Sequence, residues 1–236
     1  MKYLAILLFA VMAISHTLCG CLLWQKREAT GDRSRTILAL IGWASAFMAV
    51  LYIFRTFADT LPVGGPLLAP VQVFFPFGWL MFLLLYPLEL IRPVVDRANL
   101  YLLMFAPLVL MFILGICTGV AYTPLLSVDD LWMHIGQADV WFRLLALAVL
   151  PFYGFVLCGV RFCWEETYTD KAFLRLFACV LCLMGLLQAG VQLTLSYGLF
   201  LLQGAVWMLC FFGLTWYELC ERLWVRRNHS SLKNNL

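Results

Sequence analysis

The chain has 236 residues, of which 64% are hydrophobic and only 12% are charged, whereas an ordinary soluble domain is about 45–50% apolar and about 25% charged. Its 16 Lys and Arg and 13 Asp and Glu residues are too few to cover the surface of a soluble domain of this length. The composition therefore indicates an integral membrane protein. It excludes a disordered chain, a disulfide-stapled secreted module and a nucleic-acid-binding surface.

Seven charge-poor runs are long enough to cross a bilayer, whose apolar core takes about 20 residues of helix. They cover approximately residues 3–24, 36–57, 68–91, 100–122, 141–163, 173–194 and 198–220. The connections are short, apart from one longer segment before the fifth run. We therefore expect an all-α fold, a seven-transmembrane helix bundle over residues 1–220. A basic tail over residues 221–236 is expected to lie against anionic lipid.

The positions of Lys and Arg predict the orientation, because cytoplasmic loops retain positive charge. With seven crossings, the side of the C-terminus carries every basic residue except Lys2, Arg55 and Arg143. This asymmetry predicts an outer N-terminus and a cytoplasmic C-terminus, which requires an odd number of spans. The basic residues that follow the first run, from Lys26 to Arg35, also favour a retained helix over a cleaved signal peptide.

Polar side chains are rare within the predicted spans, and each is a candidate site because burying a polar group in lipid is costly. Gln188 and Gln192 are four residues apart, on one face of the span over 173–194. A very short connection makes the last two spans antiparallel neighbours, so Gln203 is expected at a similar depth. We predict a polar centre of Gln188, Gln192 and Gln203, which either joins helices or lines a ligand pocket.

Catalytic and cofactor-binding patterns are missing from the sequence. His16 is the only histidine well inside a span, and one buried imidazole cannot form a bis-histidine haem site. No lysine falls inside a span, which excludes a retinal protein, and neither H-E-x-x-H nor G-x-S-x-G occurs. We therefore expect a protein that is not an enzyme and that has no cofactor and no metal site.

A proline-flanked cluster ends the third span, with the sequence Y-P-L-E-L-I-R-P. Pro87 removes a hydrogen bond within the helix and is expected to kink it, and Pro93 marks its end. Glu89 and Arg92 are three residues apart and are expected to form a pair. The cluster is either a helix end with its ion pair or a hinge that transmits movement to the cytoplasm.

The longest outer segment precedes the fifth span. Asp129 is expected to cap a short surface helix that carries Leu131 and Trp132 towards the membrane. Asp139 is expected to cap the fifth span, four residues before Arg143. The segment is interpreted as an interfacial anchor or as a lid over an external ligand site.

These clusters resemble a known family. The motifs are Y-P-L-E-L-I-R-P, the outer L-W-x-H-x-x-x-x-D-V-W-F-R and the cytoplasmic C-W-E-E-T-Y-T-D. They are similar to the N-terminal multi-span membrane region of AraC-type helix-turn-helix transcriptional regulators of Bacteroidota, and the resemblance covers roughly residues 36–220. It implies signal sensing across the bacterial inner membrane, with Glu89, Arg92, Asp139 and Arg143 as candidate coupling residues.

The chain departs from that family at its C-terminus. Only a short segment follows Trp224, which leaves no room for a DNA-reading domain. We therefore expect no direct nucleic-acid binding by this chain, and either a truncated regulator or a bundle that acts through a separate cytoplasmic regulator or kinase.

Two functions from different classes follow. The first is an inner-membrane sensory or anchoring module that relays an external or membrane-borne signal from an unknown ligand, in transcriptional regulation. The alternative is a small-solute transporter or channel, with the three glutamines in its path; an enzyme acting on lipid would lack catalytic groups. Gly115 and Gly119 form a G-x-x-x-G face that pairs helices within the chain or between copies in a homo-oligomer.

Overall fold

The computed structural model describes residues 2–27, 33–57, 79–80, 82–91, 128–164 and 171–221, and it shows no strand among them. The described helices are α1 (Lys2–Lys26), α2 (Arg33–Phe57), α4 (Leu85–Ile91), α6 (Val128–Met133), α7 (Ala138–Leu144), α8 (Leu150–Cys163), α9 (Lys171–Thr194) and α10 (Tyr197–Trp216). Two π-helical segments, η3 (Leu145–Val149) and η4 (Tyr217–Glu221), continue α7 and α10. The all-α prediction is confirmed for this part of the chain.

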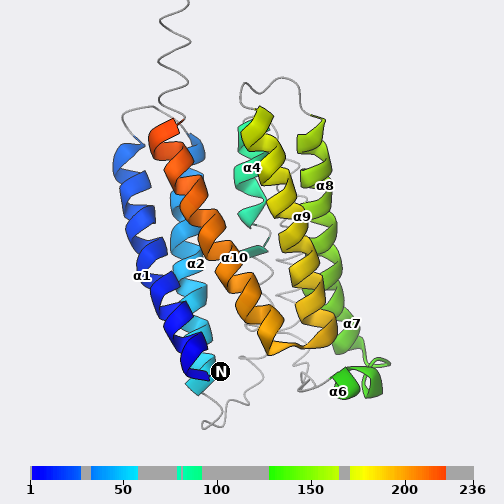
Figure 1. The fold of residues 1–236 in the computed structure, drawn as a ribbon. Helices are drawn as coiled ribbons and strands as arrows, with labels where there is room; N and C mark the ends of the chain where they lie inside the picture. Colours follow the sequence, from blue (N-terminus) through cyan, green and yellow to red (C-terminus); the bar gives the residue numbers. More distant parts are fainter. Residues whose placement is uncertain are drawn as a thin grey trace, which may run out of the picture.

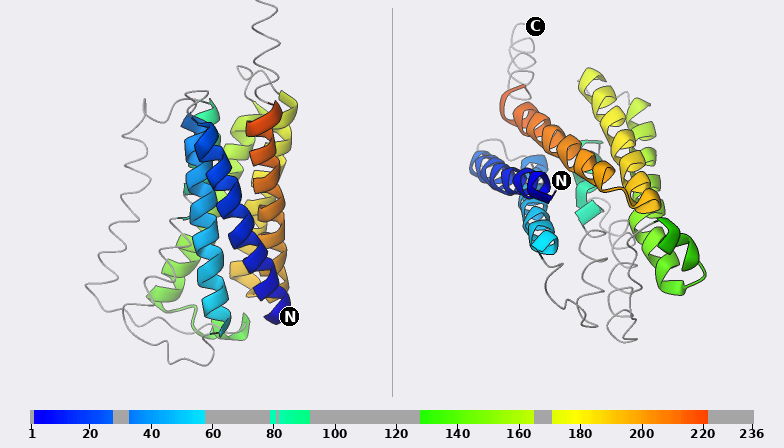
Figure 2. Two further views of the ribbon diagram at one scale, coloured as in Figure 1. Left: turned by 90° about the vertical axis from the view of Figure 1, so that its left-hand side faces the viewer. Right: turned by 60° about the horizontal axis from the view of Figure 1, so that its bottom comes forward.

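The long helices lie side by side in one bundle (Figure 1). α1 packs along α2, α8 packs along α9, and α10 lies between the two pairs, in contact with α1 and α9 (Figures 1 and 2). The start of α1, the α9–α10 turn and α6 lie at one end, which we call the α6 end. α4 and η4 lie towards the opposite end, which we call the η4 end.

Four helices are long and apolar enough to cross a membrane. They cover Tyr3–Lys26, Arg33–Phe54, Lys171–Thr194 and Tyr197–Cys220. They coincide with the predicted spans 3–24, 36–57, 173–194 and 198–220. Large apolar side chains on their surfaces are exposed, as along one side of α1 at Leu7, Val11, Ile14 and Leu18. Such a surface suits lipid rather than water, and the chain is a membrane protein.

The other three predicted spans are described only in part. The span predicted over 141–163 lies within a continuous helical run, Ala138–Cys163, whose apolar part is the shorter helix Leu147–Arg161. Of the span over 68–91, the described residues are 79–80 and 82–91, which include α4. The span over 100–122, with Gly115 and Gly119, and the tail beyond Glu221 lie outside the described residues.

The predicted helix caps at the α6 end are corrected by the structure. α6 begins at Val128 and α7 at Ala138, so Asp129 and Asp139 are each the second residue of a helix rather than its cap. An acidic residue in a first turn still interacts favourably with the helix dipole. Leu131 faces the protein rather than the membrane, since it is 2% exposed, while Trp132 is 66% exposed. Consecutive helical residues point about 100° apart, so Leu131 can be buried in the protein while Trp132 stays exposed.

A small apolar cluster closes the α6 end. Leu131, Val140 and Leu144 are buried together, and Leu195 packs against them. Leu195 follows α9 in the left-handed conformation, with φ of 50°, and its N–H donates to the carbonyl of Val191. Glycine is usual at this position because it has no Cβ. Here the side chain packs against the outer helices and thereby connects the α9–α10 turn to α6 and α7.

Candidate functional site

A chain of buried hydrogen bonds joins three helices in the bundle. The Nε2 atom of Gln203 on α10 donates to Oε1 of Gln188 on α9, at 2.6 Å. The Nε2 atom of Gln188 donates to the carbonyl oxygen of Leu147 in η3, also at 2.6 Å. Gln188 and Gln203 are only 5% and 6% exposed. The structure therefore brings these two glutamines together.

Pro151 explains why a backbone carbonyl is open to this bond. In an α-helix, the carbonyl of Leu147 would accept from the N–H of residue 151, and residue 151 is proline, which has no N–H. The run widens into the π-helical segment η3, which ends two residues before Pro151, at Val149. The amide of Gln188 supplies a donor to the carbonyl. π-helical turns inside α-helices are frequent at functional sites.

The third predicted glutamine lies apart from this chain. Gln192 is one turn nearer the α6 end and is partly buried. Among the described residues no hydrogen bond joins it to Gln188 or Gln203. Gln192 therefore has the same side chain as the buried pair but lies outside their hydrogen bonds, so it is a suitable control position.

The predicted coupling residues occupy both ends of the bundle. Glu89 and Pro87 are in α4, where Pro87 is buried and Glu89 is partly buried. A turn at Leu84 interrupts the helical path, and Pro87 sits in the first turn of α4, where an N–H would have no helical partner. Arg143 is in α7 at the α6 end and is partly buried.

Two other predicted coupling positions are less fully described. Asp139 lies in the first turn of α7. Arg92 lies outside the described residues.

His16 is fully buried between α1 and α10. Its ring stacks on Phe211 with centroids 4.3 Å apart and lies 6.4 Å from the ring of Trp207. Its Nδ1 is 3.3 Å from the hydroxyl of Ser15, and its Nε2 has no hydrogen-bond partner among the described residues. Those residues also contain no group of three or more His, Cys, Asp or Glu that would hold a metal ion.

A buried ionic cluster at the η4 end was not predicted. Arg35 at the start of α2 lies with its Nε 3.6 Å from Oε2 of Glu218 in η4. The hydroxyl of Tyr86 in α4 donates to Oε1 of Glu218 at 2.9 Å. Arg35 also donates to the carbonyl oxygens of Lys26, at 3.1 Å, and of Glu218. The cluster joins the α1–α2 pair, α4 and the end of α10.

The sequence contained a signal for this cluster. Glu218 falls inside the predicted span 198–220, where an acid is costly without a partner. Arg35 directly precedes the span 36–57, where its charge also supports the predicted orientation of the chain in the membrane. Both side chains are almost fully buried, 3% exposed for Arg35 and 0% for Glu218.

Ser45 on α2 accepts two indole hydrogen bonds. The Nε1 atom of Trp79 donates to its hydroxyl oxygen at 2.9 Å, and that of Trp207 donates at 3.1 Å. The two rings meet edge to face at 5.9 Å. Ser45 thus connects α2 to α10 and to the chain just before α4.

Replacing Ser45 by alanine is expected to lower the free energy of unfolding by about 1 kcal/mol, because two indole N–H groups lose their shared acceptor. Unfolding in mixed detergent and SDS micelles measures this change. The control is Thr17→Ala, since Thr17 is exposed and its hydroxyl donates to the Ala13 carbonyl of its own helix. Equal losses in the two variants would contradict a role for Ser45 between helices.

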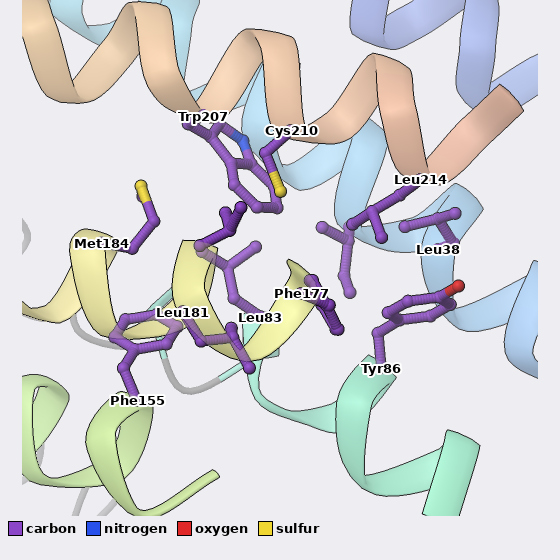
Figure 3. A pocket seen from close by; sticks show the side chains of 12 residues that line it. Leu38, Leu83, Tyr86, Phe155, Phe177, Leu181, Met184, Trp207, Cys210 and Leu214 are labelled. Carbon is purple, nitrogen blue, oxygen red and sulfur yellow. The ribbon is translucent and has the colours of Figure 1, made fainter. Parts of the chain in front are cut away.

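An apolar pocket lies beside the polar chain, one helical turn from Gln188 and Gln203. Figure 3 shows Trp207, Cys210 and Leu214 of α10 facing Phe177 and Leu181 of α9, with Tyr86 and Phe155 at the sides. The space between these side chains holds about one water-sized sphere. An apolar space of this size carries no polar path through the bundle.

Comparison of the chain with protein-family models, with curated proteins and with solved structures found no match.

Proposed function

We propose that the chain is a sensory or anchoring module of the bacterial inner membrane, which relays an external or membrane-borne signal to a cytoplasmic partner in transcriptional regulation. The observation that carries the proposal is the hydrogen-bond chain from the carbonyl of Leu147 through Gln188 to Gln203. It connects the helical run that begins at the α6 end with the helix that leads into the C-terminal tail. Movement of η3 would therefore be passed through Gln188 and Gln203 to α10.

The proposed orientation places the α6 end outside the cell and the η4 end inside. In support, the start of α1 and the end of α10, which continues into η4, lie at opposite ends of the bundle (Figure 1). The basic residues Lys26, Arg33, Arg161 and Lys171 belong to helix ends on the η4 side. Seven crossings, with two in the parts of the chain around 68–91 and 100–122, satisfy this arrangement.

Tag-accessibility mapping tests the orientation. A tag before Met1 is expected to react with an impermeant reagent added to intact spheroplasts, whereas a tag after Leu236 is expected to react only after lysis. A tag between α6 and α7, at Gly136, is expected to behave like the N-terminal one. Both termini in one compartment would overturn the orientation and with it the direction of the relay.

The proposed mechanism is a shift between two arrangements of the bundle. A ligand that moves α6 and α7 would displace η3, and the Leu147 carbonyl would then separate from Gln188. A ligand that prefers one arrangement tenfold shifts the balance by about 1.4 kcal/mol. One buried hydrogen bond contributes about 0.5–1.5 kcal/mol. The free energy of breaking the Gln188–Leu147 hydrogen bond is therefore similar to that of the shift.

The experiment compares gene expression in the source bacterium. Deletion of the gene is expected to change a defined set of transcripts, and the wild-type gene is expected to restore them. Gln188→Leu and Arg143→Ala are expected to insert normally and to fail to restore them. Gln192→Leu is the matched control, because Gln192 lies one turn from Gln188 and outside the hydrogen-bond chain. Unchanged transcripts in the deletion strain, or full restoration by Gln188→Leu, would overturn the proposal.

The transport alternative is less well supported. Gln188 and Gln203 bond to each other, and the neighbouring pocket is apolar and small. A solute path along the glutamines would require both bonds to break. Flux of small solutes into liposomes that contain only the purified chain would favour transport over sensing.

A further inference from the structure

The buried ionic cluster at the η4 end holds together the start of α2, α4 and η4, which also pack against one another or against α1. We propose that Arg35, Tyr86 and Glu218 form a latch that fixes η4, and that movement of α4 releases it. This inference rests on the proposed function only for the direction in which the signal travels. The latch itself is a physical property of the bundle.

Arg35 forms the fixed side of the latch. Arg35 lies near the start of α2, and its guanidinium donates to the carbonyl oxygen of Lys26 at the end of α1. α1 and α2 pack along each other over their length (Figure 1). A charge held by this helix pair is a stable reference point for the carboxylate of Glu218.

Tyr86 forms the movable side. It is held in α4, which has only seven residues and begins just after the turn at Leu84. Its neighbour Pro87 cannot donate a backbone hydrogen bond to the preceding turn. The short helix is joined to the preceding residues through the turn at Leu84, whose carbonyl accepts from the N–H of Leu88 at 3.3 Å. The Tyr86 hydroxyl donates to Oε1 of Glu218, whereas the 3.6 Å ion-pair contact is at Oε2.

Glu218 is the part that the latch holds. It lies in η4, a π-helical turn that precedes the basic tail. π-helical turns are rare and depend on tertiary contacts, because their hydrogen-bond geometry is less favourable than that of an α-helix. Loss of the contacts at Glu218 would let η4 return to α-helical winding and so change the rotation of η4 relative to α10.

The test is hydrogen exchange of the backbone amides of residues 217–221, measured by mass spectrometry on the full chain in nanodiscs. Tyr86→Phe removes one hydroxyl and is expected to speed exchange in η4 about tenfold, as for loss of a hydrogen bond to a charged group. Exchange in α9 is expected to stay unchanged, which shows that the variant is folded. Tyr153→Phe is the matched control, since Tyr153 is 62% exposed on α8.

A second variant separates a latch from a merely stabilising contact. Pro87→Ala frees the φ angle in the first turn of α4, so it is expected to speed exchange in η4 when Tyr86 is present and to have no further effect in the Tyr86→Phe background. Unchanged exchange in Tyr86→Phe, a rise spread over all helices, or additive effects of the two substitutions would each overturn the latch. Because exchange requires no cytoplasmic partner, a negative transcript experiment with a positive exchange result would reject the signalling role alone.

Discussion

Glu218→Gln is expected to lower the free energy of unfolding by about 3–5 kcal/mol, because it leaves the buried charge of Arg35 without its counter-ion. Arg35 and Glu218 are 3% and 0% exposed, so water cannot replace the lost partner. Reversible unfolding in mixed detergent and SDS micelles measures the change. This is the largest stability effect that we expect from a single side chain in the described bundle.

The matched control for this prediction is Glu89→Gln, the same substitution in α4, where the side chain is partly exposed. It is expected to cost less than about 1 kcal/mol. The double variant Arg35→Leu with Glu218→Leu is expected to recover most of the stability lost in Glu218→Gln, because apolar residues of similar volume often replace a buried ion pair without loss. Similar losses in Glu218→Gln and Glu89→Gln would show that the ion pair contributes little.

Gly159→Ala is expected to destabilise the protein by about 1–3 kcal/mol through overpacking between α8 and α9. A Cβ at Gly159 would lie 2.6 Å from Sγ of Cys182 and 3.0 Å from the backbone oxygen of Ala178. Rotation of Cys182 relieves only the first contact, and the second requires the two helices to separate. Unfolding in mixed micelles and retention on size-exclusion chromatography measure the effect.

Gly213→Ala provides the same substitution without the contact. A Cβ at Gly213 on α10 would meet nothing within 4 Å, and alanine favours a helix over glycine by about 1 kcal/mol. This variant is expected to be as stable as the wild type or more stable. Combining Gly159→Ala with Cys182→Ala is expected to restore stability only in part. Full restoration would show that the Ala178 backbone does not limit the approach of the helices.

The long helices could be predicted from composition because lipid imposes a length of about 20 apolar residues. The proximity of Gln188 and Gln203 could also be predicted, because the short turn between their helices forces the two helices to be antiparallel neighbours. Their third partner, the Leu147 carbonyl, could not be predicted from side-chain patterns, since a backbone group has no sequence signature. Pro151 marked the missing donor, but only the fold shows which side chain replaces it.

The ionic cluster was missed because its members are far apart in the sequence. In the sequence, Arg35 belongs to the loop charges that predict the orientation, and Tyr86 belongs to the motif around Pro87. Several helix ends could meet at the η4 end. Their arrangement depends on how apolar helix surfaces pack, and these surfaces are too similar in sequence to predict which of them meet. The inward position of Leu131 was missed for a similar reason, since an apolar residue near a membrane surface suits either lipid or a small protein core.

The π-helical segment η3 holds one more residue than an α-helical path of the same rise would contain. Each helical residue accounts for about 100° of rotation, so this extra residue sets how α7 is rotated about the helix axis relative to α8. Shortening the stretch between Leu145 and Val149 by a single residue would swing Val140 and Leu144 out of the cluster that they now share with Leu195. The extra residue of η3 therefore sets the direction in which the two short helices at the α6 end face.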